Sequence, residues 1–341
     1  MKRDMQAWKK SIIENREVQA LPIMTYPGLE LTGMKVMDIV TNGENQAACI
    51  ESLAARYPSL AAVTMMDLSL EAEAFGAEVS FSDAEIPAVI GQLIGDLDSA
   101  RALRVPEVGE KRTGVQLRSL EIASRRIENK PVFGGHIGPF SLTGRLLDMK
   151  NVLLAVRRQP PLVHAVLEKA TEFLVRYAQA IKAAGANGLI IAEPAAGLIS
   201  PAQCDEFSSP YVRKIVSAVQ DQDFMVILHN CGNTVKLVSS MLSTDAEGLH
   251  FGNSIKMTDV ISQVPADRLA CGNIEPAGAF KMGTPEEMRL RVQALLAEMR
   301  EYPNFVLSSG CDLPPRTPLA NVDAFFAAMA DENARRQKDL Q

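Results

Sequence analysis

Two apolar runs decide the fold: GLIIAE (188–193) and FMVILH (224–229). Each is short, aliphatic and ended by a polar residue, which is the pattern of a buried β-strand. Six further runs share it: Leu21–Tyr26, Ala77–Phe81, Pro131–His136, Glu247–Phe251, Arg268–Asn273 and Asn304–Ser309. Helical stretches such as Leu162–Ala184 and Pro285–Glu301 fill the gaps. Strands that alternate with helices pair in parallel, so the sequence predicts an α/β fold, a (β/α)8 TIM barrel.

The rest of the chain fits one barrel domain over residues 1–341, with an N-terminal helix over residues 1–20. Residues 27–130 have the weakest strand pattern, and we expect them to hold insertions. The glycine signatures of nucleotide-binding sheets are missing, because no G-x-G-x-x-G follows a strand and no G-x-x-x-x-G-K-[ST] occurs. Their absence favours the barrel over a doubly wound sheet.

Composition narrows the function classes. Hydrophobic residues make up 47% of the 341 positions, so a large core is expected and disorder is not. The net charge of −6 argues against a nucleic-acid binder, which usually presents a basic face. The N-terminus lacks an apolar signal segment, and no apolar run reaches the roughly 18 residues of a membrane span. Five scattered cysteines indicate free thiols and a cytoplasmic, reducing setting.

Metal-ligating residues follow two of the apolar runs. In a barrel, function lies at the carboxyl ends of the strands. In VILHNCGNT (226–234), His229 and Cys231 are two positions apart and point to the same side of an extended chain. Cys311, in LSSGCDLPP (307–315), ends another run. One imidazole and two thiols are typical of catalytic zinc with an open fourth position. The alternative is that both cysteines are small core residues.

These motifs resemble a known family. ILHNCGNTVKLV (227–238) and LSSGCDLPPRTPLANVDAF (307–325) resemble the uroporphyrinogen decarboxylase superfamily, in its zinc-dependent, corrinoid-linked methyltransferase branch. GGHIGPFSLTGRLL (134–147) and CGNIEP (271–276) also resemble it. That branch includes methylcobalamin:coenzyme M methyltransferases. The resemblance implies a TIM barrel, zinc on His229, Cys231 and Cys311, and an enzyme that moves a methyl group to or from a corrinoid.

The resemblance also implies partners. Family corrinoid proteins carry D-x-H-x-x-G, but no histidine here has an aspartate two positions earlier, so cobalamin is expected on a separate protein. The small-molecule partner is a methyl donor or acceptor. Zinc would activate either a substrate thiol or the oxygen of a methyl ether, and both remain open. The oligomeric state is also open, a homodimer included.

Two other functions stay in view. A uroporphyrinogen decarboxylase-type lyase would need the arginine-rich loop of that enzyme, but MTYPGLELTG (24–33) holds no arginine. A non-catalytic barrel that binds zinc or thiols would share the metal ligands and lack turnover.

Five other residues are candidate site residues. We predict Glu193 and His136 as catalytic groups, because each ends an apolar run. Asp67, His250 and Glu275 are predicted substrate contacts. For each carboxylate the structural alternative is an ion pair at a strand end, and for each histidine a hydrogen-bonded place in the core.

Overall fold

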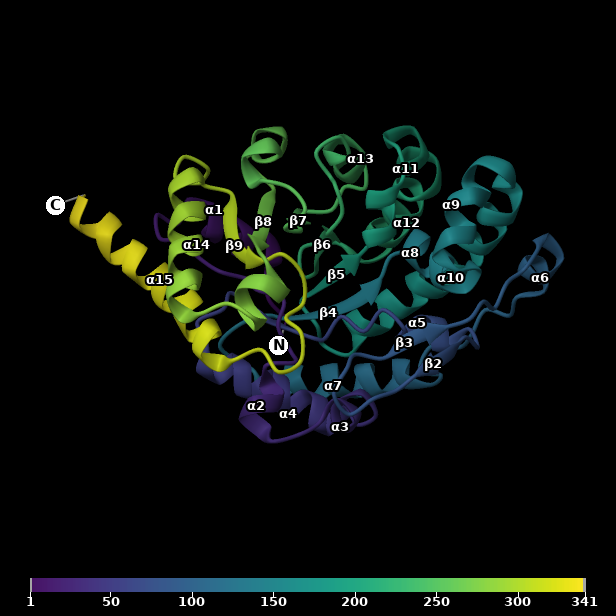
Figure 1. Ribbon diagram of the computed structural model, residues 1–341, viewed down its shortest axis with the longest axis horizontal. Coiled ribbons are helices and arrows are strands. Elements are labelled where there is room, and N and C mark those ends of the chain that lie inside the picture. Colours follow the sequence, from purple (N-terminus) through teal and green to yellow (C-terminus); the bar gives the residue numbers. More distant parts are fainter. Residues whose placement is uncertain (1, 340–341) are drawn as a thin grey trace.

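The computed structural model describes residues 2–339. A seven-stranded parallel sheet with the order β1-β4-β5-β6-β7-β8-β9 forms its centre, and the strands curl around a common axis (Figure 1). The bounds are β1 (Ala62–Val63), β4 (Val132–Ile137), β5 (Gly188–Ala192), β6 (Met225–Asn230), β7 (Gly248–Phe251), β8 (Leu269–Ile274) and β9 (Phe305–Ser309). The predicted class, α/β with parallel strands, is confirmed.

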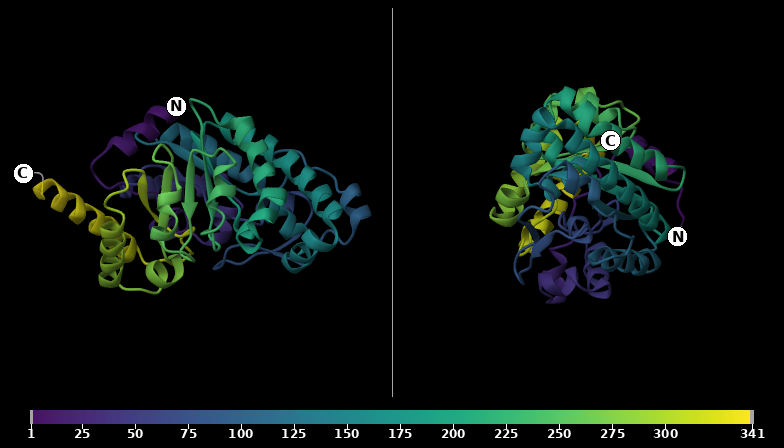
Figure 2. Two further views of the ribbon diagram at one scale, coloured as in Figure 1. Left: turned by 90° about the horizontal axis from the view of Figure 1, so that it is seen from above. Right: turned by 90° about the vertical axis from the view of Figure 1, so that its right-hand side faces the viewer.

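Helices connect consecutive strands and cover the convex side of the sheet, while α15 projects from one end (Figures 1 and 2). The predicted long helices are observed as α10 and α14. The helices before β4 are α1 (Met5–Glu14), α2 (Gly28–Thr32), α3 (Val36–Val40), α4 (Gly43–Arg56), α5 (Leu70–Ala74), α6 (Leu97–Ala102) and α7 (Arg112–Arg126). Later come α8 (Pro139–Leu147), α9 (Met149–Arg158), α10 (Pro160–Ala183), α11 (Pro201–Phe207), α12 (Ser209–Val219), α13 (Val238–Leu242), α14 (Pro285–Glu298) and α15 (Leu319–Asp339). Short turns of other helix types are η1 (Pro194–Leu198), η2 (Met257–Asp259), η3 (Ile261–Gln263) and η4 (Pro276–Lys281).

Alternation of side chains along each strand creates two cores. The concave core contains every second strand residue, including Phe133, Ile190 and Ile227. Helix α1 completes this core, and the Trp8 ring lies 5.8 Å from that of Phe133. The intervening residues, such as Leu189, belong to the larger convex core beneath the helices.

The N-terminal segment differs from both predictions made for it. The predicted helix over 1–20 ends at Glu14, and the predicted strand Leu21–Tyr26 is not a regular strand. Asn15 caps α1 in an extended conformation, and Pro22 lacks a backbone N–H for a continuous ladder. Residues 19–21 still pair with β9 on one side, where the Leu21 N–H donates to the Leu307 carbonyl at 2.9 Å.

The predicted strand Ala77–Phe81 is also corrected. It contains β2 (Glu78–Ser80), which pairs only with β3 (Ala88–Ile90) in an antiparallel hairpin outside the main sheet. Neither strand of the hairpin has a fully buried residue. The strand of the main sheet is β1, whose two residues are too few to show a period. Both differences lie in residues 27–130, where insertions were expected.

Within residues 2–339, no helix combines the length and apolar character that crossing a membrane requires.

Close packing at Gly188 gives a test of the fold. A Cβ there would lie 2.2 Å from the Phe133 ring, inside the concave core. We expect Gly188→Ala to reduce the free energy of unfolding by about 1–3 kcal/mol, because the ring must move. The control is Gly95→Ala, where a new Cβ meets only the end of the Gln92 side chain, at 4.0 Å. Urea denaturation of both variants measures the difference, and equal stabilities would contradict this packing.

Candidate metal centre

His229, Cys231 and Cys311 come together at the carboxyl end of the sheet. One ligand atom from each lies within 4.8 Å of the other two. His229 belongs to β6, Cys231 to the loop after it, and Cys311 to the loop after β9. The histidine is buried, and the two cysteines are half-buried. Within residues 2–339 this trio is the one grouping of metal-ligand side chains with such spacing.

The local chain path explains the convergence. Met225, Ile227 and His229 alternate onto the concave face of β6, so His229 continues an apolar row. The loop that follows β6 packs closely against Gly252, where an added Cβ would lie 2.4 Å from the Cα atom of Cys231. The Cys231 carbonyl also accepts a hydrogen bond from the Ser254 hydroxyl at 2.8 Å. The cysteine is therefore fixed beside the strand end.

The two thiols have opposite electrostatic environments. Contact with the Cys311 thiol, followed by the neighbouring imidazole of His229, lowers the pKa of Cys231 to about 4 despite its burial. The same contact with Cys231, together with burial, raises the pKa of Cys311 well above its usual value. The pair thus holds one proton less than two free thiols at neutral pH. A cation replaces the remaining proton when both sulfurs act as ligands.

His250 lies behind His229 rather than at an open surface. The two histidines are partners in the β6–β7 register, and their Nδ1 atoms are 2.8 Å apart. The His250 Nε2 atom is 2.8 Å from the Ser308 hydroxyl. His250 is fully buried, and burial holds its pKa well below the usual value. Because both of its ring nitrogens are engaged, the predicted substrate contact is not supported by this geometry.

Glu193 braces helix α8. It follows β5 on the convex side, in phase with Leu189 and Ile191. Its carboxylate accepts hydrogen bonds from the Phe140 N–H at 3.0 Å and the Ser141 N–H at 2.6 Å. These N–H groups begin α8, where backbone donors lack intrahelical acceptors and attract negative charge. Burial nevertheless raises the pKa of Glu193 to about 7. Its catalytic role stays a prediction, and its visible role is structural.

His136 also faces the helices. It has the same phase as Gly134, where a Cβ would meet Ile181 of α10 at 2.6 Å. Its Nδ1–H donates to the Ile137 carbonyl at 2.7 Å, while Nε2 is buried without a hydrogen-bond partner. Burial lowers the pKa of His136 to about 4, so it is neutral. The two-residue repeat therefore separates His136 from the metal centre, and its catalytic role stays a prediction.

The two remaining candidates have partners of their own. Asp67 is buried and ion-paired with Arg112, and its second oxygen accepts from the Ser69 hydroxyl at 2.6 Å. Glu275 faces Arg291 of α14, with 3.8 Å between charged atoms. Both contacts match the ion-pair alternative. The predicted substrate roles of Asp67 and Glu275 therefore stay predictions without geometric support.

Sequence reasoning missed three residues. Arg112, the first residue of α7, neutralises both Asp67 and Glu73. Ser308 lies on the concave face, in phase with Val306, and contacts His250. Arg145 of α8 is half-buried, and no described residue accepts a hydrogen bond from it or forms an ion pair with it. Counting phase along β9 would have found Ser308, but a helical arginine offers no such signal.

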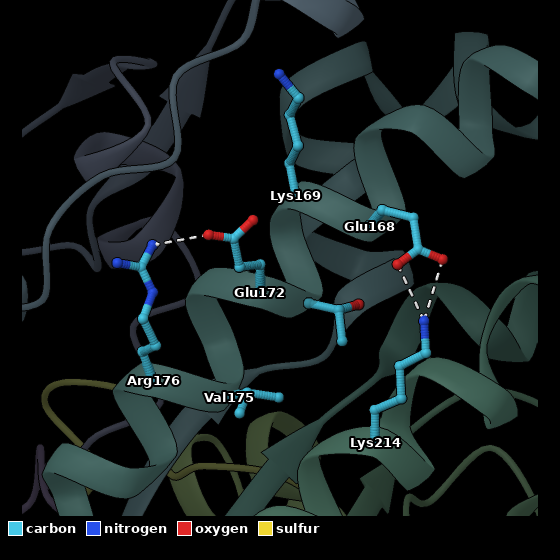
Figure 3. Close-up of a pocket in the computed structure, with 7 residues that line it drawn as sticks. Glu168, Lys169, Glu172, Val175, Arg176 and Lys214 are labelled. Carbon is cyan, nitrogen blue, oxygen red and sulfur yellow. Dashed lines mark hydrogen bonds and ion pairs between the residues drawn. The ribbon is translucent and has the colours of Figure 1, made fainter.

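A cavity of about 440 Å³ lies on the outer surface, between α10 and α12 (Figure 3). Its charged groups already have partners: Lys214 contacts Glu168 at 3.0 Å, Arg176 contacts Glu172 at 3.4 Å, and Lys169 donates to the Arg101 and Leu103 carbonyls. This cavity lies on the helix layer, and none of its lining residues belongs to the metal centre.

The fold and site define an α/β protein with one histidine and two cysteines gathered at the strand ends, close enough together to hold a metal ion. The chain belongs to the uroporphyrinogen decarboxylase (URO-D) family, whose model matches residues 15–331. It is 28% identical over 263 residues to a methylcobamide:CoM methyltransferase of Methanosarcina acetivorans, covering 75% of each chain. It is also 28% identical over 286 residues to a uroporphyrinogen decarboxylase of Desulfotalea psychrophila, covering 81% of this chain and 82% of that protein.

A solved structure supports the fold. A methyltransferase from Methanosarcina mazei superimposes with a TM-score of 0.85 at 23% identity, covering 97% of this chain and 99% of that one. The family resemblance drawn from the metal-ligand motifs is confirmed, and methyltransferases are among the matched relatives.

Glu71, whose carboxylate accepts a hydrogen bond from the Ile137 N–H at 3.2 Å, predicts a pH dependence of stability. Burial raises the pKa of Glu71 to about 8 from an ordinary 4.5. The folded chain therefore keeps a proton that the unfolded chain releases, so this stabilisation is complete below pH 4.5 and is lost as pH rises toward 8. Relative to Glu71→Gln, the wild type should lose up to about 1.4 kcal/mol per pH unit between pH 5.5 and 7.5.

Urea denaturation at three pH values measures this effect. Glu298→Gln, at an exposed acid of α14, is the control and should follow the wild type. Parallel pH profiles for the wild type and Glu71→Gln would contradict the assignment.

Proposed function

We propose that this protein is a zinc-dependent methyltransferase that moves a methyl group from a corrinoid, held by a separate protein, to a small thiol. The observation that carries the proposal is the convergence of His229, Cys231 and Cys311 at the strand ends. Relatives named methylcobamide:CoM methyltransferases support the reaction class.

The donor set fits zinc. The His229 Nε2 atom is buried and has no hydrogen-bond partner, as expected of a nitrogen whose partner is a metal ion. One imidazole and two thiolates leave a fourth position for substrate. Zinc held by these three residues would lower the pKa of a substrate thiol bound at the fourth position. The two thiolates would partly neutralise the zinc charge and so make zinc a weaker Lewis acid toward the oxygen of an ether.

Arg145 supports an anionic substrate. Burial lowers the pKa of this guanidinium, while the nearby charge of Asp67 acts in the opposite direction. A half-buried cation with no acceptor among the described residues is costly unless a ligand supplies one. We assign Arg145 to the anionic end of the thiol substrate, as a carboxylate or sulfonate would provide.

The corrinoid protein would approach the carboxyl ends of the strands. Leu198, at the end of η1 after β5, is 59% exposed, and Met282, at the end of η4 after β8, is 75% exposed. Apolar side chains on the same rim as the metal centre suit a protein partner. This chain carries no D-x-H-x-x-G, so the corrinoid belongs to that partner.

A decarboxylase-type lyase is the weaker alternative, although such enzymes are also among the relatives. Both Asp67 oxygens are engaged by Arg112 and Ser69, and residues 24–33 contain no arginine. A non-catalytic zinc or thiol module is distinguished by turnover alone.

We extend the proposal to the architecture. Residues 19–25 would take the place of the eighth strand and close the barrel. Residues 1–341 would form one domain, and the protein would work in a reducing, cytoplasmic setting. Hydrogen bonds on both sides of this segment support closure: the Leu307 carbonyl accepts from Leu21 at 2.9 Å, and the Ala20 carbonyl accepts from Leu60 at 2.8 Å.

Ligand variants test the function. The wild type should bind one zinc and demethylate methylcobalamin in the presence of coenzyme M. Cys231→Ala and Cys311→Ala should lose most zinc and at least about 100-fold of activity, because two ligands hold zinc poorly. Cys204→Ala, which removes a buried thiol from α11, should retain both. Metal analysis and the corrinoid spectrum report the results. Zinc-free wild type that resists loading would refute the metal, and loaded protein without methyl transfer would refute the reaction.

Arg145 is tested by substrate charge. Arg145→Gln should raise the KM for coenzyme M, a thiol with a sulfonate, by about tenfold or more, because the anion loses its partner. The KM for 2-mercaptoethanol, which lacks the anion, should stay within about twofold. Arg157→Gln, on the exposed side of α9, is the control. An equal change for both thiols would show that Arg145 does not read charge.

A further inference from the structure

A buried chain of hydrogen bonds runs from the candidate metal ligand to the N-terminal segment. It passes from His229 to His250 at 2.8 Å, from His250 to the Ser308 hydroxyl at 2.8 Å, and from that hydroxyl to the Leu21 carbonyl at 2.6 Å. His229, His250 and Ser308 are each at most 1% exposed. Water therefore does not offer these groups alternative partners.

The far end of the chain determines where every proton lies. A carbonyl oxygen only accepts, so the single Ser308 hydroxyl proton is directed at Leu21. The Ser308 oxygen must then accept from His250, which places the His250 proton on Nε2. The His250 ring is fully buried, and its nitrogens contact His229 and Ser308 rather than a carboxylate, so the ring is neutral and its Nδ1 atom carries a lone pair. That lone pair accepts from the His229 Nδ1–H, which leaves the lone pair of His229 on Nε2.

We propose that Ser308 and His250 are positioning residues that hold His229 in the Nδ1-protonated form, with Nε2 free to bind the metal ion. This inference rests on the proposed zinc site. His229 Nε2 is the ring nitrogen that lacks a hydrogen-bond partner, so the proton assignment and the open ligand position agree. Through these hydrogen bonds the metal site also depends on the position of the Leu21 carbonyl, which is far from His229 in the sequence.

Two neighbouring serines provide matched variants. Ser308→Ala removes the hydroxyl that orients His250. His250 can then shift its proton to Nδ1, which forces the His229 proton onto Nε2 and blocks the ligand. Ser309→Ala removes an equally buried hydroxyl, which accepts from the Ile23 N–H at 3.0 Å but does not contact His250. Both variants lose a hydrogen bond to the N-terminal segment, so general destabilisation should be similar.

The expected result is a zinc affinity about 10–100-fold lower in Ser308→Ala, measured by chelator competition. Ser309→Ala should stay within about twofold of the wild type. Ser308→Thr, which keeps the hydroxyl, should recover most of the affinity if it folds. Equal affinities in Ser308→Ala and Ser309→Ala would overturn the inference while leaving the zinc site and the proposed function intact.

A second measurement does not depend on metal or on variant folding. Long-range ¹H–¹⁵N spectra of the metal-free wild type distinguish protonated from unprotonated ring nitrogens. They should show His229 protonated at Nδ1 and His250 protonated at Nε2. A proton on His229 Nε2 would overturn the inference. If the protons lie as expected but the protein binds no zinc, the proposed metal fails and the hydrogen-bond chain stands.

Discussion

The two-residue repeat of a β-strand is the constraint on which the rest of this structure depends. Successive side chains must point to opposite faces, and in a curled sheet one face is enclosed while the other lies beneath helices. Ile227 and His229 share the enclosed face, so a candidate metal ligand continues an apolar row. Glu193 and His136 end neighbouring strands in the opposite phase, and each is held by the helix layer or its own backbone. A position at a strand end identifies candidate site residues, and the face of the sheet to which each side chain points decides which of them can reach the metal centre.

Much of the fold could be predicted from the sequence, because long apolar runs such as Phe224–His229 and long helices such as α10 carry strong periodic signals. The convergence of His229, Cys231 and Cys311 could also be predicted, since H-x-C and Cys311 each follow such a run. The failures have physical causes. β1 is too short to show a period, and Ala77–Phe81 has strand propensity without a place in the main sheet. The substrate roles of Asp67 and Glu275 stay predictions, and their ion-pair partners, Arg112 and Arg291, could not be identified from the sequence pattern.

The polar groups around the site mainly support it. Glu193 fixes the start of α8, Arg112 neutralises Asp67, and Asp312, beside Cys311, accepts from the Met66 N–H at 2.9 Å. The Glu193 and Asp312 contacts each join segments that follow two different strands, and the Arg112–Asp67 pair lies within the connection between β1 and β4. Buried charge is costly unless it is paired, so these contacts hold the loops in one arrangement. The His229 Nε2 atom and the Arg145 guanidinium differ from these groups, because neither has a hydrogen-bond partner among the described residues. Both groups are therefore available to bind a ligand.

The joining of the N-terminal segment to β9 has a consequence for biosynthesis. Ile23 and the Ser309 hydroxyl that it contacts are 286 positions apart, and Cys311 follows two residues later. A ribosome adds about 5–20 residues per second, so His229 and Cys231 are synthesised several seconds before Cys311. During that interval the nascent chain offers only part of a binding site. A metal ion held by all three residues would therefore be bound only after Cys311 has been made and β9 has paired with the N-terminal segment.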